Sequence, residues 1–536
     1  MRLATLLLLI GYVLSTPVVV QAHPDESHAK KHNAVRAGDI AFANSGAKSA
    51  QAPFLEGLAL LHDFEYERAA EAFRRAQSAD PAFAMAYWGE AMTHNHGIWM
   101  EQDLTAARAV LAKLGPTPDA RRSKAGTARE RAYLGAIEIL YGDGTKEARD
   151  FRYADAMQVV HATYPSDVDA TAFYALSLLG TCHSGRDFAV YMKAAALLEV
   201  VYPTHLRHPG VLHYLIHSYD DPIHAPLGLR AAERYGALAP DAPHALHMTS
   251  HIFLASGMWN DVISANLQAI AAGSHYAAQH GHAAKGCGHY PTWLMYGYLQ
   301  EGRHSAAAET LAVCRKSAFA VSATTPASFD PDRSALSSYV YMRLLQAVET
   351  GTTEPITAFD ASKSGNESPA FFAAYANAVI ALRAGDLAQL KAAVATLGQR
   401  SAQILSQLAA EGAEAKADRM SVDVIVAQMN AIAQIRAGDP EGGLIALRKA
   451  ADAESAMTME FGPPLIALPS WELLGEELLR AQKPADAALA FRNALARAPG
   501  RTRSLRGLLQ SEQLTGDAAG AAATQVELAR YPRQVN

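Results

Sequence analysis

Two pairs of histidines have the residue type and the spacing to bind a transition metal. The first pair is His213 with His217, and the second is His247 with His251. Residues four apart on a helix project from the same face, so each pair presents two imidazoles side by side. An interval of 34 residues separates His213 from His247 and His217 from His251. If the chain repeats with this period, all four rings face one groove.

The chemistry expected of four neutral imidazoles is coordination of Zn, Cu, Fe or Ni rather than of Ca or Mg. Asp220 and Asp221 follow the first pair and are the candidate catalytic residues. Either one would add a ligand, orient a ring, or lie beside a metal that activates water or oxygen. The sequence contains no His-Glu-x-x-His motif, so a zinc protease of that type is not indicated. The competing interpretation is a metal-free polar groove whose rings hydrogen-bond a peptide.

Helical hairpins are the elements that must position these rings. One hairpin spans residues 53–81 and another spans residues 469–499, each with small and aromatic residues at fixed intervals and a closing proline. Small residues let paired helices approach closely, an aromatic fills the gap between them, and proline ends the second helix. The residues concerned are Gly57, Ala69, Phe73, Ala76 and Pro81, and then Trp471, Leu474, Gly475, Leu478, Ala487, Phe491, Ala494 and Pro499.

Together with the 34-residue interval, these residues resemble the tetratricopeptide repeat. The resemblance implies a right-handed α-solenoid in which the first helix of each repeat lines a concave groove that binds a peptide or protein. It places both histidine pairs in the fifth and ninth groove positions of successive repeats. It also places His244 in the second position and His183 near the twelfth. Trp99 and Tyr214 are further candidates for the ligand groove.

The fold class expected is all-α, because no segment alternates apolar and polar residues long enough to require a strand. Each helix pair is too small to bury its own apolar face and depends on its neighbours. We expect an N-terminal solenoid carrying the histidine groove, divergent helical repeats, and C-terminal repeats, with a polar loop after the first part. The ranges are 51–320, 335–460 and 466–536.

The N-terminus has the pattern of a cleaved signal peptide over residues 1–22, with a positive end, an apolar stretch and a small-residue cleavage site. Residues 23–50 are predicted to form a disordered tail containing histidine and lysine. No later run reaches about 18 apolar residues, so no stable membrane insertion is expected after cleavage. These features predict an exported protein, periplasmic or secreted.

Composition and motifs argue against a nucleic-acid partner and a nucleotide cofactor. The formal net charge is −6, and no Lys/Arg-rich stripe alternates with aromatics, so nucleic acid is not an expected partner. Glycine-rich segments lack the strand–helix context of a phosphate loop, so no nucleotide cofactor is expected. Cys182, Cys287 and Cys314 allow at most one disulfide, and their spacing does not select the pair.

The leading hypothesis is therefore an exported scaffold whose histidine-rich groove binds a transition metal, a peptide or protein, or both. A metalloenzyme with hydrolytic or oxidative chemistry is the first alternative. A metal-free interaction adaptor is the second.

Overall fold

The computed structural model describes eight stretches of the chain, which are residues 35–284, 286–320, 329–331, 334–352, 354–356, 366–410, 415–459 and 461–531. The predicted signal peptide lies outside them, as do the first part of the tail and much of the polar loop after residue 320. Residues 36–536 group as one compact unit, separate from residues 1–35, and the description below concerns this larger unit.

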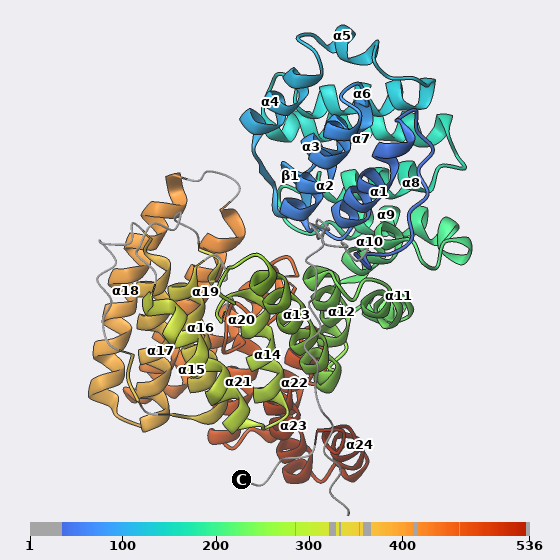
Figure 1. Ribbon diagram of the computed structural model, residues 1–536. Coiled ribbons are helices and arrows are strands. Elements are labelled where there is room, and N and C mark those ends of the chain that lie inside the picture. The colour runs from blue at the N-terminus through green and yellow to red at the C-terminus, as the bar shows by residue number, and fades with distance from the viewer. Residues whose placement is uncertain are drawn as a thin grey trace, which may run out of the picture. The chain divides into compact units, whose positions relative to one another are not determined.

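Helices make up almost all of the regular structure (Figure 1). In the first part of the described chain they are α1 (Lys48–His62), α2 (Tyr66–Ala79), α3 (Ala84–Met92), α4 (Leu104–Leu114), α5 (Pro118–Arg122), α6 (Ala128–Leu140), α7 (Lys146–Thr163), α8 (Val168–Leu179), α9 (Phe188–Val201), α10 (Pro209–Tyr219), α11 (Ala225–Leu238), α12 (Pro243–Ala255), α13 (Trp259–Gln279) and α14 (His289–Gln300). They continue as α15 (His304–Ala320), α16 (Ala335–Thr350), α17 (Ser368–Ala384), α18 (Leu387–Ala410), α19 (Lys416–Arg436), α20 (Pro440–Ser455), α21 (Ser470–Arg480), α22 (Pro484–Arg497), α23 (Thr502–Thr515) and α24 (Ala518–Leu528).

Helices that follow one another in sequence pack against each other, and two phenylalanines show why. Phe73 on α2 lies between two glycines, because a Cβ at Gly57 on α1 or at Gly89 on α3 would approach its ring to 3.0 or 2.3 Å. Phe491 on α22 lies in the same way between Gly475 on α21 and Gly507 on α23. In these two repeats the second helix thus inserts an aromatic ring between two first helices. The predicted all-α architecture of tetratricopeptide-type hairpins is confirmed, while the handedness of the superhelix stays a prediction.

Two short elements interrupt the helices between α3 and α4. Strands β1 (Asn95–His96) and β2 (Glu101–Gln102) pair antiparallel around the 3₁₀ turn η1 (Gly97–Trp99). A second 3₁₀ turn, η2 (Tyr202–Thr204), precedes α10. The small hairpin was not expected from the sequence, and it packs Trp99 against Phe64 and His244. Within the described ranges, the helices are too short or too polar to span a bilayer.

The predicted disordered tail is wrong for residues 35–50. Phe42 is buried, and its ring packs at 5.5 Å from Phe54 and 5.5 Å from Tyr133. The Arg129 guanidinium lies 3.9 Å from the centre of the same ring. An apolar residue in a lysine-containing segment thus anchors the segment to the first repeats.

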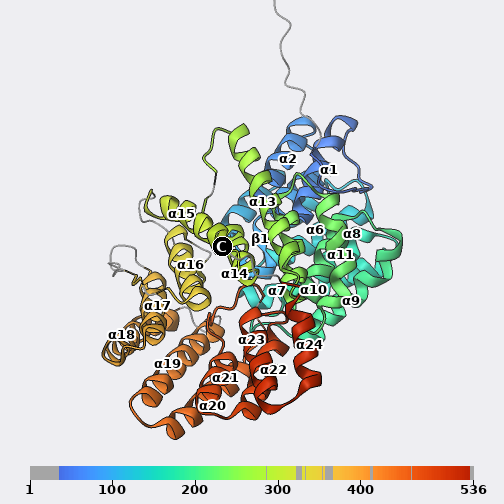
Figure 2. The same ribbon diagram turned by 90° about the horizontal axis from the view of Figure 1, so that it is seen from below.

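Residues near the C-terminus pack on the middle of the chain (Figure 2). Trp259 Nε1 on α13 donates to the Gly500 carbonyl oxygen at 2.9 Å, and the Tyr531 hydroxyl donates to the Gly257 carbonyl oxygen at 2.7 Å. The repeats therefore make contacts beyond those between neighbours, which alone hold a simple solenoid together.

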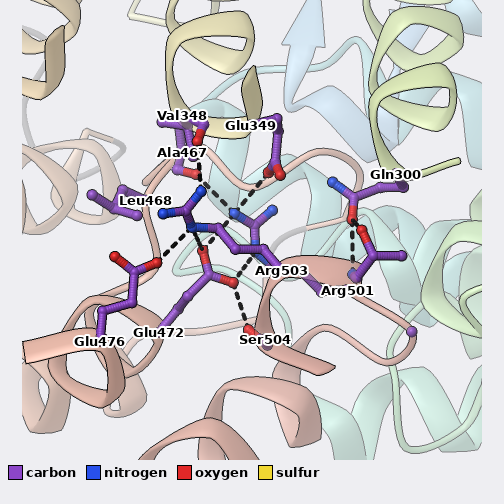
Figure 3. A network of polar contacts seen from close by, with 12 residues as sticks. Gln300, Val348, Glu349, Ala467, Leu468, Glu472, Glu476, Arg501, Arg503 and Ser504 are labelled. Carbon is purple, nitrogen blue, oxygen red and sulfur yellow. Dashed lines mark hydrogen bonds and ion pairs between the residues drawn. The ribbon is translucent and has the colours of Figure 1, made fainter. Parts of the chain in front are cut away.

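A buried arginine cluster holds this junction (Figure 3). Arg501 is fully buried and lies 2.8 Å from a Glu349 carboxylate oxygen and 2.7 Å from one of Glu472. It also donates to the Tyr296 hydroxyl at 2.9 Å. Its partners come from α14, α16 and α21, so one guanidinium joins helices from three places in the sequence.

Candidate metal centre

The first of two histidine triads joins two helices. His213 and His217 lie on α10, and His244 lies in the first turn of α12. One ring nitrogen from each lies within 4.8 Å of the other two. His213 and His217 are buried and His244 is half-buried. Proline at the first position of both helices fixes where each first turn begins, and so places His244 beside the α10 pair.

The ring nitrogens of this first triad could hold a metal ion. His213 Nδ1 lies 2.6 Å from the His62 carbonyl oxygen, which can only accept, so Nδ1 donates and Nε2 carries the lone pair. The Nε2 atoms of His213, His217 and His244 are buried with no hydrogen-bond partner among the described residues. Burial lowers the pKa of all three imidazoles well below the usual value, and this keeps the rings neutral.

Aromatic rings enclose this triad. Phe64 follows α1 and packs with its ring centre 4.3 Å from that of His213 and 5.6 Å from that of His244. Its φ of 57° lies in the left-handed region, which costs about 1–2 kcal/mol for a residue with a side chain. Trp99 packs edge-on to His244 at 5.8 Å. The triad is therefore a desolvated site, in which a bound cation interacts strongly with its ligands.

The second triad is built by the same rule, one repeat later. His247 and His251 lie on α12, and His289 is the first residue of α14. One ring nitrogen from each again lies within 4.8 Å of the other two. His247 Nδ1 lies 2.8 Å from Asn266 Oδ1, and His251 Nδ1 lies 2.6 Å from Asp220 Oδ2. These contacts orient both rings so that the two Nε2 atoms face each other at 3.1 Å.

A third buried cluster has a different character. Asp169 Oδ1 accepts from His62 Nε2 at 3.0 Å and from His208 Nε2 at 3.2 Å. The other nitrogen of each ring is also bonded, His62 Nδ1 to the Tyr214 hydroxyl and His208 Nδ1 to the Val211 amide. Both imidazoles thus use both nitrogens within the protein. This cluster is a packing network that links α1, α8 and α10.

The four predicted metal ligands do not form a single cluster. His213 and His217 belong to the first triad, while His247 and His251 belong to the second. All four are at most 3% exposed, so they do not line an open groove. The predicted groove is filled here by Phe64 and Trp99 over the first triad, and by Trp293 and Phe461 over the second. A peptide or protein ligand elsewhere on the repeats stays a prediction.

The other predicted site residues separate into two groups. His244 joins the first triad, Trp99 lies against it, and Asp220 orients His251 from behind. The remaining residues bind elsewhere, with Tyr214 bonded to His62, His183 at 3.0 Å from Asp150, and Asp221 paired with Arg186 and His224. Asp221 also accepts from the backbone amides of Ile223 and His224, so it caps the turn before α11.

The sequence reasoning missed His289, Asn266 and Phe64. A signal for His289 was present, because His244 also stands in the first turn of a first helix. The segment 280–288 breaks the 34-residue register before α14 and hides the correspondence. The structure pairs Cys287 in this segment with Cys314 on α15, which decides between the possible disulfides.

Comparison with known proteins adds fold-level likeness only. No family model matches the chain, and no curated protein matches it. Among solved structures, a monomeric mutant of IFIT1 with Gppp-AAAA is 13% identical with a TM-score of 0.35, covering 88% of this chain and 95% of that one. The Cut9–Hcn1 assembly of APC/C is 11% identical with a TM-score of 0.33, covering 92% and 76%. The TPR domain of P58(IPK) is 11% identical with a TM-score of 0.23, covering 88% and 99%. The tetratricopeptide-type architecture therefore rests on the helices and close-packed glycines of this chain.

Proposed function

We propose that this chain is an exported transition-metal-binding protein, and that the first triad, formed by His213, His217 and His244, holds the ion. The observation that carries the proposal is a set of three imidazoles that lie together, with one ring nitrogen of each within 4.8 Å of the other two, and whose buried Nε2 atoms have no hydrogen-bond partner among the described residues. A buried polar atom left unpaired costs about 1–3 kcal/mol. Three such atoms at one point are accounted for by a shared ligand.

An ion fits the space better than a peptide does. His213 and His217 are buried, His244 is half-buried, and the rings of Phe64 and Trp99 pack against the triad, so the site is enclosed rather than open to a peptide chain. A proton would not replace the ion, because the low pKa of these rings opposes protonation. Three neutral imidazoles suit Cu or Zn.

Three protein ligands leave a tetrahedral ion with one open position, as in catalytic zinc sites. This open position favours a metalloenzyme as the second candidate function. Asp220 and Asp221 are not assigned as the general base of such an enzyme, because each carboxylate already accepts a hydrogen bond from a histidine. Cobalt loading followed by absorption spectroscopy distinguishes the two functions, since an exchangeable fourth ligand shifts the spectrum when azide or cyanide is added.

Export is supported by the disulfide between Cys287 and Cys314, since such bonds persist in oxidising compartments. Fractionation of the native host, with the protein followed by antibody, tests this part separately. Recovery of the mature chain in the cytosol alone would overturn it.

Metal analysis of protein purified without a histidine tag tests the main proposal. We expect bound Cu or Zn in the native chain and loss of the ion from the first triad in H213A/H217A. His304→Ala is the matched control, because His304 is exposed at the start of α15. The same trace occupancy in all three proteins would overturn the proposal.

A further inference from the structure

We propose that the second triad, formed by His247, His251 and His289, holds a second transition-metal ion beside the first, so that the protein carries a two-metal centre. This inference deepens the proposed function and rests on it. The partner of the second site is again an ion that prefers imidazole, Cu or Zn. Three independent observations point to it.

The first observation is that the structure repeats the construction. In each triad one first helix contributes two histidines four residues apart, and the next first helix contributes one from its opening turn. The pair moves by 34 residues from His213 and His217 to His247 and His251. Helix α12 therefore serves both triads, completing the first with His244 and founding the second with His247.

The second observation concerns protons. Asn266 Nδ2 donates to the Val262 carbonyl oxygen at 2.8 Å, which leaves Oδ1 facing His247 as an acceptor. His247 Nδ1 and His251 Nδ1 both face acceptors, so both must carry hydrogen. When both rings are neutral, their Nε2 atoms are then two lone pairs that face each other at 3.1 Å. With a metal about 2.0–2.1 Å from each nitrogen, the nitrogen–metal–nitrogen angle would be about 100°, which is close to tetrahedral.

The third observation is the support behind the ligands. A carboxylate that accepts from the far nitrogen of a metal-binding imidazole fixes its orientation and increases its basicity. Asp220 stands in this position to His251, at 2.6 Å and 2% exposed. The first triad has the His62 carbonyl oxygen in the same place. The second site therefore carries a negative charge that the neutral carbonyl does not supply, and we expect it to hold a divalent ion more tightly than the first.

The two sites adjoin each other. The ring centres of His217 and His251 are 6.1 Å apart, and those of His244 and His247 are 6.3 Å apart. Trp293 packs 4.4 Å from His251 on the second side, while Trp99 packs against His244 on the first. Each site thus has a tryptophan beside it, so that Cu(II) loading is observable by quenching of fluorescence.

Titration of the tag-free, metal-stripped full chain with Cu(II) tests this inference. We expect two ions per native chain, one in H247A/H251A and one in H213A/H217A. The electron paramagnetic resonance spectrum should show two interacting spins in the native chain and an isolated spin in each variant. Quenching of tryptophan fluorescence follows the loading of the remaining site in each double variant.

The outcomes separate the two proposals. One ion per native chain, retained in H247A/H251A, would overturn the second site and leave the proposed function intact. One ion lost only in H247A/H251A would instead overturn the assignment of the first triad. Two ions retained in both variants would overturn both.

A milder variant keeps the test decisive if the double variants do not fold. Asp220→Asn preserves the size of the side chain and should weaken Cu(II) binding at the second site by about 10–100-fold, leaving the first unchanged. Circular dichroism confirms that the variant is folded. If each site binds Cu(II) in D220N with the affinity that it has in the native chain, the role given to Asp220 is overturned and, with it, the second site.

Discussion

The two histidine triads and the arginine cluster both bury polar groups, but they do so with opposite results. In the arginine cluster, Arg501 meets two carboxylates, a hydroxyl and a backbone carbonyl oxygen (Figure 3). In the first triad, the imidazoles of His213, His217 and His244 are oriented but leave their Nε2 atoms unpaired. The polar groups of Arg501 find their partners within the protein, whereas the buried Nε2 atoms of the triad are left for the ion that we propose.

This difference assigns the two regions separate roles. A paired buried charge fixes one arrangement of the surrounding helices, and removing its partner is strongly destabilising. Unpaired buried nitrogens cost stability in the free protein and return it on binding. The His62–Asp169–His208 cluster shows that this chain can satisfy histidines when only packing is needed. Mutations in the two regions therefore test this difference directly.

The largest effect is expected from Arg501→Ala. Glu349 and Glu472 are at most 4% exposed; Glu349 would lose its cation, and Glu472 would keep only Arg503 at 3.5 Å. We expect the free energy of unfolding to fall by about 3–5 kcal/mol, measured by urea denaturation. Arg448→Ala is the control, since its ion pair with Asp452 is more than half exposed, and should change stability by less than about 1 kcal/mol. A similar small change in R501A would remove the contrast.

A change of opposite sign is expected from His217→Leu in the metal-free protein. Leucine fills a similar volume and removes a buried nitrogen that has no partner, so we expect stabilisation of about 1–2 kcal/mol. His208→Leu is the matched control, because it breaks a bond to Asp169 and should destabilise instead. Destabilisation of equal size in both variants would show that the nitrogen of His217 has a hydrogen-bond partner, and would contradict the contrast between the first triad and the arginine cluster.

The smallest effect expected is a change of slope with pH. Burial lowers the pKa of His217, so below about pH 6.5 the unfolded chain binds a proton there and the folded chain does not. Stability therefore falls as pH falls, and His217 contributes about 1.4 kcal/mol per pH unit. In metal-free H217L the stability lost between pH 6.5 and 5.5 should be smaller by about 1 kcal/mol, because the unfolded imidazole is only half protonated at pH 6.5. Identical slopes in the two proteins would contradict the neutral, buried ring.

Local pattern predicted the helical repeats because their packing is local. The glycine and phenylalanine positions of a hairpin contact residues within one repeat length, so Gly57, Phe73 and Gly89 report the fold directly. Phe42 was misjudged because its burial depends on Trp88 and Tyr133, which lie far along the chain. The arginine cluster could not be predicted from local pattern either, because Arg501 and its partner Tyr296 are 205 residues apart in the sequence.

The sequence predicted which histidines lie side by side on one helix, but it did not predict how the histidines divide between two triads. Spacing alone placed His213 beside His217 and His247 beside His251 on single helix faces. Which rings then meet across helices depends on where each first turn begins, and this is set by Pro243 for His244 and by the insertion before α14 for His289. Phe64 gave no signal, because its position follows from a left-handed residue in a turn.

The contact between Trp259 and Gly500 has a consequence for biosynthesis. A growing chain can stack its early hairpins as they emerge, since each contacts its neighbours. Phe461, which covers His251, and Arg501, which bonds Tyr296 on the helix that begins with His289, are translated much later. The pocket around His251, which Trp293 covers from one side, therefore lacks its second cover until the closing repeats have been made. Ribosome-stalled chains ending before residue 461 should consequently expose these imidazoles to chemical modification that the finished protein resists.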